Sequence, residues 1–376
     1  MSFGIGVLGA TGFIGTPYRE EIRAAPEDAR IVALCARRRD LLEAAGRADR
    51  AQLITDDWRQ VIDHPDVNVV LICTPDALHS DAVMACVASG KHIVCEKPIG
   101  LNGREALDMW HAVRNARLGH FVPFWTRYVP VFARAREILR QGVAGQIRAV
   151  VYRWHNPRPP VMPLTWRDDA TLSSAGSIAD VGSHAYDTIR WILGTSATRV
   201  LAHAGVITPA KPDLGHLNLA EAIQFGQQPS AKLADTSSAP TWRRGTAFDY
   251  ASVAFELEDE TVGTLILSHA PFLRKGLAPE IEFHGTLASI SVDRLQSTVA
   301  VVPSGSVVPQ VERIDDPGSG NRFARYVFPA LRDRIAGRDS VHPGMNDGCR
   351  AQLFTDAAAT SAQTGGWVSL PTAPDL

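Results

Sequence analysis

The chain has 376 residues, of which 45% are hydrophobic and 21% charged, and its formal net charge at pH 7 is −2. This balance is that of an ordinary globular protein and gives no reason to expect nucleic acid or an anionic membrane as a partner. No apolar run approaches the length that spans a bilayer, the start carries no basic leader region, and the five cysteines form no paired metal-ligand spacing. We therefore expect a cytoplasmic, metal-independent protein, and the length suggests two domains.

In the first third of the chain, short apolar runs alternate with stretches of helical pattern. The apolar runs occupy residues 3–9, 29–36, 67–74 and 92–95, and the last of the intervening helices is expected over residues 81–88. This alternation predicts a doubly wound parallel sheet, an α/β fold whose ligands lie beyond the carboxyl ends of the strands.

The later part of the chain has the pattern of an antiparallel sheet. Two helices are expected near residues 104–117 and 130–141, and a third around residues 184–193. Strand-like runs follow one another without helices between most of them; they cover residues 147–154, 198–205, 250–257, 261–270, 280–285, 288–293 and 298–302. We expect a Rossmann-type first domain over residues 1–122 and an α+β second domain with a largely antiparallel open sheet over residues 123–376.

The segment over residues 208–246 is rich in Pro, Gly, Ser and Ala and shows little periodicity. A structureless stretch of this length is uncommon inside a compact domain. The sequence leaves two interpretations open, a lid or arm over a site and a disordered segment.

A glycine-rich turn follows the first apolar run and opens the first helix. Its glycines are Gly9, Gly12 and Gly15, whereas Gly4 and Gly6 fall within the strand itself. A tight turn, the close approach of the backbone to a pyrophosphate and close helix packing each require glycine, and the helix N-terminus offers N–H groups to the anion. We expect this turn to bind a dinucleotide through residues Gly9, Thr11, Gly12, Phe13 and Ile14.

The second strand ends in Ala36, Arg37 and Arg38, where dinucleotide folds usually place an acidic residue for the adenosine ribose. Alanine cannot bind the ribose hydroxyls, whereas arginine can pair with a 2′-phosphate. These residues predict NADP(H) in preference to NAD(H). A solvated basic run at the start of a helix is the alternative.

Lys97 follows the fourth apolar run and is one of only five lysines in a chain whose basic residues are mostly arginine. An amine, unlike a guanidinium group, can exchange protons near neutral pH. We therefore consider Lys97 a candidate for proton transfer, with a solvated lysine before a turn proline as the alternative.

Several motifs together resemble the Gfo/Idh/MocA family of oxidoreductases. They are Thr74-Pro75 with His79, Gly90-Lys91-His92, Glu96-Lys97-Pro98, Arg127, the glycines 142 and 145, and Asp180-Val181-Gly182-Ser183-His184, followed by a helix after residues 343–348. The resemblance extends over nearly the whole chain. Two features depart from the family pattern: the glycine turn is one residue longer, and Trp125-Thr126 replaces the usual Asn-Tyr pair.

The resemblance implies a catalytic set of Lys97, Asp180 and His184. Removing a hydride from a carbinol carbon requires removal of the hydroxyl proton, for which a neutral imidazole is suited, while a carboxylate can orient the ring. Lys97 would hydrogen-bond the developing alkoxide or relay its proton. Considered by spacing alone, Asp180 could instead cap a helix and His184 could be an ordinary core histidine.

The resemblance also implies contacts with cofactor and substrate. The cofactor contacts are expected from Thr74, Pro75, His79, Glu96, Lys97, Trp166 and Arg167, and the substrate contacts from His155 and Asn156. Asp187, three residues beyond His184, could bind a sugar hydroxyl or be a solvated helix carboxylate.

The resulting expectation is a homodimeric or homotetrameric dehydrogenase acting on a secondary alcohol or ketone of a sugar, cyclitol or related polyol. The alternatives are a non-catalytic, NADP-binding regulatory protein on the same fold and a diol or imine reductase of the same family.

Overall fold

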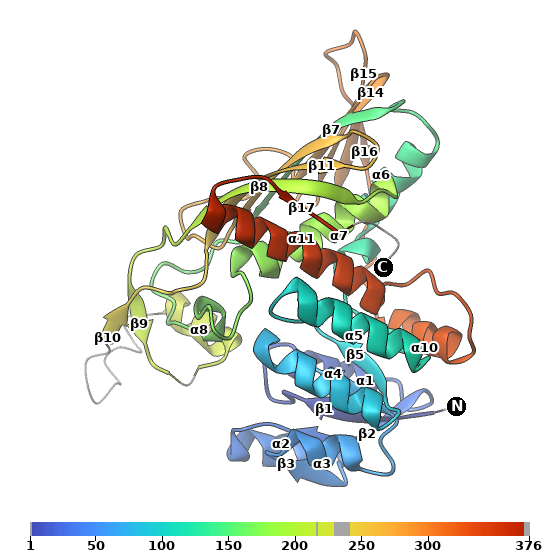
Figure 1. Cartoon of the computed structure of the whole chain (residues 1–376), viewed down its shortest axis with the longest axis vertical. Coiled ribbons are helices and arrows are strands. Elements are labelled where there is room, and N and C mark those ends of the chain that lie inside the picture. The colour runs from blue at the N-terminus through green and yellow to red at the C-terminus, as the bar shows by residue number, and fades with distance from the viewer. Residues whose placement is uncertain (1, 216, 229–240, 372–376) are drawn as a thin grey trace. The chain divides into compact units, whose positions relative to one another are not determined.

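The structure is a computed structural model that describes residues 2–215, 217–228 and 241–371 (Figure 1). The chain forms two compact units. The first contains Met1–Pro123, Asn218–Ala220 and Gly320–Gln352, and the second contains Phe124–Leu217, Glu221–Ser319 and Leu353–Leu376.

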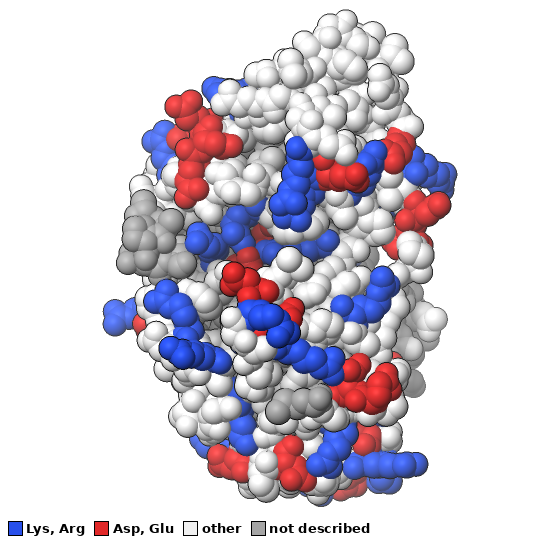
Figure 2. Space-filling model, turned by 90° about the vertical axis from the view of Figure 1, so that its right-hand side faces the viewer, with Lys and Arg blue, Asp and Glu red and all other residues white. Residues whose placement is uncertain are grey.

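Within the described residues, no helix is long and apolar enough to cross a membrane. Basic and acidic side chains are interspersed on the face drawn in Figure 2, in keeping with the small net charge.

The first unit contains a six-stranded parallel sheet in the order β3-β2-β1-β4-β5-β6. Its strands are β1 (Phe3–Leu8), β2 (Ala29–Cys35), β3 (Leu53–Thr55), β4 (Val69–Ile72), β5 (His92–Cys95) and β6 (His120–Phe121). The predicted doubly wound sheet is confirmed. β3 and β6 had no sequence prediction, because runs of three and two residues are too short to show a period.

Helices connect these strands and cover the sheet. They are α1 (Gly15–Arg23), α2 (Arg39–Asp49), α3 (Trp58–Asp63), α4 (His79–Ala88) and α5 (Gly103–Asn115). Side chains that accept backbone N–H groups cap two of them: Asp57 caps α3 and Asn102 caps α5. α4 begins two residues before the expected Asp81, at the end of a short 3₁₀ turn over Asp76–Leu78.

A late segment of the chain completes the first unit. It contains α10 (Phe328–Ile335) and the start of α11 (Met345–Thr364). The side-chain amide of Asn321 donates to the carbonyl oxygen of Glu21 over 2.7 Å, and the ring of Phe328 lies 5.6 Å from that of Phe3. A functional division between residues 1–122 and 123–376 stays a prediction.

The second unit is built on a nine-stranded sheet in the order β16-β15-β14-β13-β7-β12-β11-β8-β17. Its strands are β7 (Ile147–His155), β8 (Ala197–Gly205), β11 (Tyr250–Leu257), β12 (Val262–Ser268), β13 (Ile281–Gly285), β14 (Ala288–Asp293), β15 (Thr298–Pro303), β16 (Gln310–Arg313) and β17 (Val368–Ser369). Every pairing is antiparallel except that of β7 with β12. The predicted, largely antiparallel sheet is confirmed.

Two long helices pack on this sheet. α6 (Pro130–Arg140) packs on β14 and β15, and α7 (Ser177–Leu193) packs on β7, β11 and β12. A β-carbon on Gly182 of α7 would lie 2.7 Å from the side chain of Leu267, so glycine allows this helix to approach the sheet closely. α7 begins seven residues before the expected start, which places Asp180 inside its first turn.

The segment over residues 208–246 contains regular structure, contrary to expectation. It forms β9 (Lys211–Asp213), α8 (Leu219–Gln227) and β10 (Thr241–Arg243), and β9 pairs with β10. The buried ammonium group of Lys211 lies 2.8 Å from a carboxylate oxygen of Asp168, which ties the segment to the rest of the unit. Residues 216 and 229–240 lie outside the described residues, and a lid function stays a prediction.

We predict that His120 makes the stability of the protein depend on pH. Its buried Nδ1 accepts the backbone N–H of Met345, and burial lowers its pKa to about 3, with Arg334 acting in the same direction. A histidine in the unfolded chain has a pKa of about 6.5, so above that pH the neutral His120 makes its full contribution to the stability of the folded protein. It is lost as the pH falls from 6.5 toward 3, by about 1.4 kcal/mol per unit, because the unfolded chain binds the proton first.

Urea unfolding of the parent protein and of His120→Asn between pH 7.5 and 5 measures this contribution. The asparagine retains an acceptor for Met345 but does not titrate, so the parent should lose stability more steeply than the variant. Parallel stability curves would contradict the assignment.

Candidate active site

The glycine turn after β1 is pressed against the ends of the neighbouring strands. Gly9 has a φ of 79°, and a β-carbon there would lie 2.5 Å from the carbonyl oxygen of Cys73 at the end of β4. A β-carbon on Gly15 would lie 2.3 Å from the carbonyl oxygen of Gly9. The N–H groups of Gly9 and Ala10 both donate to the carbonyl oxygen of Cys35, which ends β2. Only glycine fits at both positions, as a turn shaped for a phosphate group requires.

The turn lies where the order of the sheet reverses, between β1 and β4. In doubly wound sheets this crevice is the position of a bound nucleotide, and the N-terminus of α1 directs N–H groups toward it. Residues 11–14 are partly or largely exposed, and the guanidinium of Arg19 donates to the carbonyl oxygen of Ala10 over 3.0 Å. The residues present therefore fit a dinucleotide. Gly4 and Gly6 lie within β1, as expected.

Basic and acidic side chains both lie near the end of β2. Ala36 is buried, whereas Arg37 is exposed. Burial, together with the carboxylates of Asp56 and Asp57, raises the pKa of the neighbouring Cys35 thiol to about 11. These carboxylates follow β3, which pairs with β2, so they approach the region where an adenosine ribose would bind. The sequence reasoning considered only β2 and missed them.

His79 joins the loops that follow β4 and β5. Its Nδ1 lies 2.9 Å from the carbonyl oxygen of Pro98, and its Nε2 lies 2.9 Å from that of Thr74. Burial lowers the pKa of His79, and the two carbonyl contacts act in the opposite direction. The ring is completely buried, so its placement argues against the expected contact of this side chain with the cofactor. It positions Thr74 and Pro98 instead.

Lys97 directly follows Glu96, a buried glutamate that is held by a contact with α1. The hydroxyl of Tyr18 in α1 donates to Oε1 of Glu96 over 2.6 Å. Lys97 itself is partly exposed. The backbone on both sides of Lys97 is therefore held by buried groups, Glu96 before it and Pro98 after it, which suits a side chain that must be placed accurately.

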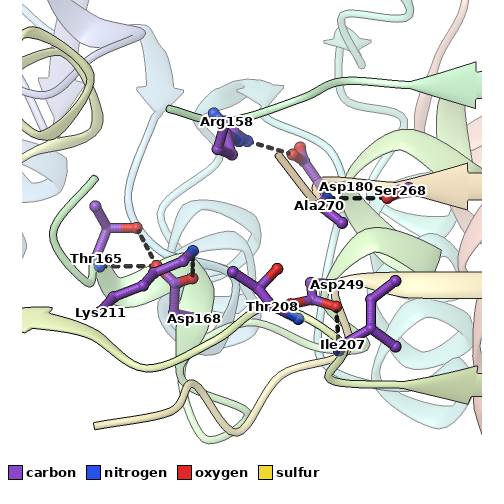
Figure 3. A network of polar contacts seen from close by, with 10 residues as sticks. All are labelled: Arg158, Thr165, Asp168, Asp180, Ile207, Thr208, Lys211, Asp249, Ser268 and Ala270. Atoms are coloured by element: carbon purple, nitrogen blue, oxygen red, sulfur yellow. Dashed lines mark hydrogen bonds and ion pairs between the residues drawn. The ribbon is translucent and has the colours of Figure 1, made fainter. Parts of the chain in front are cut away.

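In the second unit, Asp180 is the centre of a polar cluster (Figure 3). Its Oδ2 lies 3.3 Å from a guanidinium nitrogen of Arg158 and 3.1 Å from Nε2 of His269. Arg158 and His269 are both buried. Burial lowers the pKa of His269, and the nearby carboxylate of Asp180 acts in the opposite direction.

The parallel pairing of β7 with β12 brings this cluster together. His155 lies opposite Ser268, and the chain then continues beside β12: the N–H of Asn156 donates to the carbonyl oxygen of Ser268, and that of Arg158 to the carbonyl oxygen of His269. The sequence reasoning missed Arg158 and His269. The position of His269 directly after an apolar strand was the available signal.

His184 lies one helical turn after Asp180 and is held between aromatic rings. Its ring stacks on Trp154 of β7 with centroids 5.6 Å apart, and the ring of Phe124 meets its edge at 5.8 Å. Such contacts restrict the rotation of the imidazole. The predicted pair therefore lies on one helix, although the contacts of Asp180 described above go to Arg158 and His269.

The two expected substrate contacts lie at the end of β7. Burial lowers the pKa of His155, and Arg153 contributes in the same direction, which favours the neutral ring. Its Nδ1 is buried without a hydrogen-bond partner in the described part of the chain. His155 and Asn156 both line a cavity of about 450 Å³, so their placement suits contact with a ligand.

Trp166 and Arg167 form a 3₁₀ turn together with Asp168. The guanidinium carbon of Arg167 lies 4.4 Å from the centre of the Trp166 ring. Thr165 and Asp168 form a capping box, and the carboxylate of Asp168 also binds Lys211, as Figure 3 shows. The turn is therefore rigidly anchored, while its contact with a cofactor stays a prediction.

Asp187 has a structural environment that argues against the expected contact with a sugar hydroxyl. It is completely buried, and its two carboxylate oxygens accept from Nη2 and Nε of Arg127 over 2.6 and 2.8 Å. Both alternatives proposed for it, a substrate ligand and a solvated helix carboxylate, require an exposed side chain. The ion pair instead joins α7 to the 3₁₀ turn over Trp125–Tyr128.

We predict that Asp187→Asn lowers the free energy of unfolding by about 3–5 kcal/mol, because it leaves the charge of Arg127 buried without its partner. Urea unfolding measures the loss. Glu256→Gln is a matched control, since Glu256 forms a similar two-bond pair with Arg199 in the same unit but at an exposed position, and its loss should be much smaller. A variant of unchanged stability with a raised KM would restore the substrate-binding interpretation.

The predicted residues are thus divided between the two units. The first holds the glycine turn, Arg37, Thr74 and Lys97, and the second holds Asp180, His184, His155 and the turn at Trp166. The structure describes each unit by itself, so the meeting of Lys97 with Asp180 and His184 stays a prediction. Among the described residues, no group of three or more His, Cys, Asp or Glu side chains could hold a metal ion.

Comparison with protein families gives two matches. The sequence model of an oxidoreductase family with an NAD-binding Rossmann fold, GFO_IDH_MocA, matches residues 3–122. The model of the GFO/IDH/MocA C-terminal domain matches residues 132–291.

Individual relatives extend over most of the chain. Levoglucosan dehydrogenase of Pseudarthrobacter phenanthrenivorans is 27% identical over 354 residues, which are 88% of this chain and 87% of the relative. Inositol 2-dehydrogenase of Rhizobium meliloti is 24% identical over 98% of this chain and all of the relative. A solved structure of levoglucosan dehydrogenase in complex with NADH has a TM-score of 0.80 at 23% identity, covers 99% of this chain and 100% of its own, and shows the same fold.

Proposed function

The chain belongs to the Gfo/Idh/MocA family of NAD(P)-dependent oxidoreductases, and we propose that it transfers a hydride between nicotinamide and a secondary alcohol or ketone of a sugar, cyclitol or related polyol. The observation that carries the proposal is the glycine turn at the sheet's reversal point, within a chain whose relatives include a levoglucosan and an inositol dehydrogenase. The division of labour follows: residues 1–122 bind the cofactor, and residues 123–376 bind the substrate and form a homodimer or homotetramer.

The bound nicotinamide supplies the hydride acceptor. Oxidation of the carbinol releases a hydride from carbon and a proton from oxygen, so the protein must accept the proton as the carbonyl forms. We assign that role to His184, whose ring is held by Trp154 and Phe124, with Lys97 as the hydrogen-bond donor and proton relay for the alkoxide. Asp180, bound to Arg158, orients the first turns of α7 that carry His184.

We predict that Lys97→Arg retains cofactor binding but lowers kcat by about 10²-fold or more, because guanidinium keeps the charge without a proton to exchange near neutral pH. Absorbance at 340 nm with a panel of sugars, cyclitols and keto-sugars measures turnover. Lys91→Arg is the control. Lys91 lies just before β5, whereas Lys97 lies just after it, and the ammonium group of Lys91 donates to the backbone carbonyl oxygens of His64 and Val67. A near-normal rate for Lys97→Arg would leave this lysine a positioning role only.

The same panel separates the alternatives. A regulatory protein would bind reduced cofactor and sugars without turnover of any of them. A diol or imine reductase would turn over diols or imines added to the panel and leave the sugars and cyclitols unchanged. A regulatory protein would need neither Lys97 nor His184, so their presence argues against that alternative.

We further propose that the cofactor is NADP(H) in preference to NAD(H). Ala36 leaves no carboxylate at the end of β2, and the exposed Arg37 is available to a 2′-phosphate. The carboxylates of Asp56 and Asp57 oppose this choice, because they would repel the phosphate.

Fluorescence titration with NADPH and NADH tests the preference. We predict that Arg37→Ala weakens NADPH binding by the loss of a charged hydrogen bond, about 1.5–3 kcal/mol, and leaves NADH binding unchanged. Arg39→Ala is the control, since Arg39 pairs with Glu43 on α2, and Asp56→Asn should strengthen NADPH binding. Equal affinities of the parent for both cofactors would show that the acidic residues prevail.

A further inference from the structure

A cavity of about 450 Å³ lies at the carboxyl end of β7, within the second unit. Residues 153–156 form one wall, the loop 272–278 between β12 and β13 forms another, and residues 293–295 after β14 close it. Its volume lies in the range of small-molecule sites. Of this lining, Trp154, His155 and Asn156 have a role in the site described above, and the loop has none.

The cavity adjoins the cluster around Asp180 and His184. Trp154 lines it and also stacks on the ring of His184. Asn156 and Arg274 line both this cavity and a second hollow of about 350 Å³, whose wall includes Arg158, the partner of Asp180. A molecule bound with its reacting carbon near His184 can therefore extend its remote end into the cavity.

The lining contains four Lys or Arg side chains and two acidic side chains, and four of these six are held in ion pairs or by backbone N–H groups, while the guanidinium of Arg274 donates to the carbonyl oxygen of Pro271. Arg153 pairs with Glu282 over 2.9 Å, and Arg294 pairs with Glu280 over 2.9 Å while lying over the ring of Trp154. Asp293 accepts two backbone N–H groups, those of Leu295 and Gln296. These partners remove most of the charge that the four residues could offer to a ligand.

Arg274 and Lys275 are different, because neither lies within ion-pair distance of a carboxylate in the described part of the chain. Burial lowers the pKa of Lys275, and the positive charges of Arg294 and Arg158 act in the same direction, whereas the carboxylate of Glu280 acts in the opposite direction. Both side chains are exposed and adjacent, so they give the loop side of the cavity an excess of positive charge. A bound anion would neutralise that charge.

We propose that the substrate is an anionic sugar whose carboxylate or phosphate group is bound by Arg274 and Lys275. This inference rests on the proposed oxidation of a sugar. The hydroxyl-bearing ring then lies toward Asn156 and His184, while the charged substituent occupies the cavity. Arg274 contributes a planar fork that suits two oxygens of either group, and Lys275 adds a compact charge.

The experiment compares three pyranoses that differ only at C6, namely glucose, glucuronate and glucose 6-phosphate, together with the corresponding galactose series. Calorimetric titration of the full-length protein, with and without bound cofactor, gives the affinities, and absorbance at 340 nm gives kcat/KM. We expect at least one anionic sugar to bind tenfold or more tightly than its neutral counterpart. The member preferred, carboxylate or phosphate, identifies the source of the charge.

Lys275→Gln and Arg274→Gln should each reduce the ratio of anionic to neutral affinity about tenfold. Arg148→Gln is the matched control, because it removes one positive charge from the opposite end of β7, and it should leave the ratio unchanged. A parent protein that binds the neutral sugars as tightly as the anionic ones, or binds no anionic sugar, overturns the inference. So does a ratio that neither variant changes.

The two failures can be told apart. Anionic sugars that bind through Arg274 and Lys275 but are never oxidised would refute the proposed function and leave the binding site intact. Efficient oxidation of neutral sugars, with no preference for the anionic members, would support the function and refute the inference.

Discussion

The parallel pairing of β7 with β12 is the constraint on which the second unit depends. It is the one parallel pairing described in that sheet, and it makes the two strands end side by side. Polar residues that follow parallel strands emerge at one edge, so Arg158 and His269 meet there and Asp180 of α7 completes the cluster. The cavity walls at residues 153–156 and 272–278 continue from the ends of the same two strands.

Close backbone packing has the corresponding role in the first unit. Gly9 and Gly15 let the turn after β1 lie against the ends of β4 and β2, and His79 and Tyr18 then fix the loops on either side of Lys97. His79 and Tyr18 make these contacts through buried side chains, and the two glycines make close backbone contacts possible because they have no side chain. They leave residues 11–14 partly or largely exposed at the start of α1, where an anion can bind.

The sequence predicted both sheets, because strands of four or more residues with apolar periodicity are recognisable one at a time. It also located the turn at Gly9 and the pair Asp180 and His184, whose spacings are local. Long-range pairing was not predictable in this way: neither the partnership of Arg127 with Asp187 nor that of Lys211 with Asp168 follows from any local pattern. Consequently, the sequence offered only a ligand contact or a solvated position for Asp187, whose partner lies 60 residues away, and it did not single out His269.

The return of residues 320–352 to the first unit has a consequence for synthesis on the ribosome. Strands β1–β6 are complete once Phe121 has been made, but Asn321, Phe328 and the start of α11, which belong to the same unit, follow about 200 residues later. At a translation rate of about 5–20 residues per second, this delay is roughly 10–40 seconds. Throughout that interval the nascent sheet exposes Phe3 and the part of β6 that α10 later covers, an apolar surface open to a chaperone.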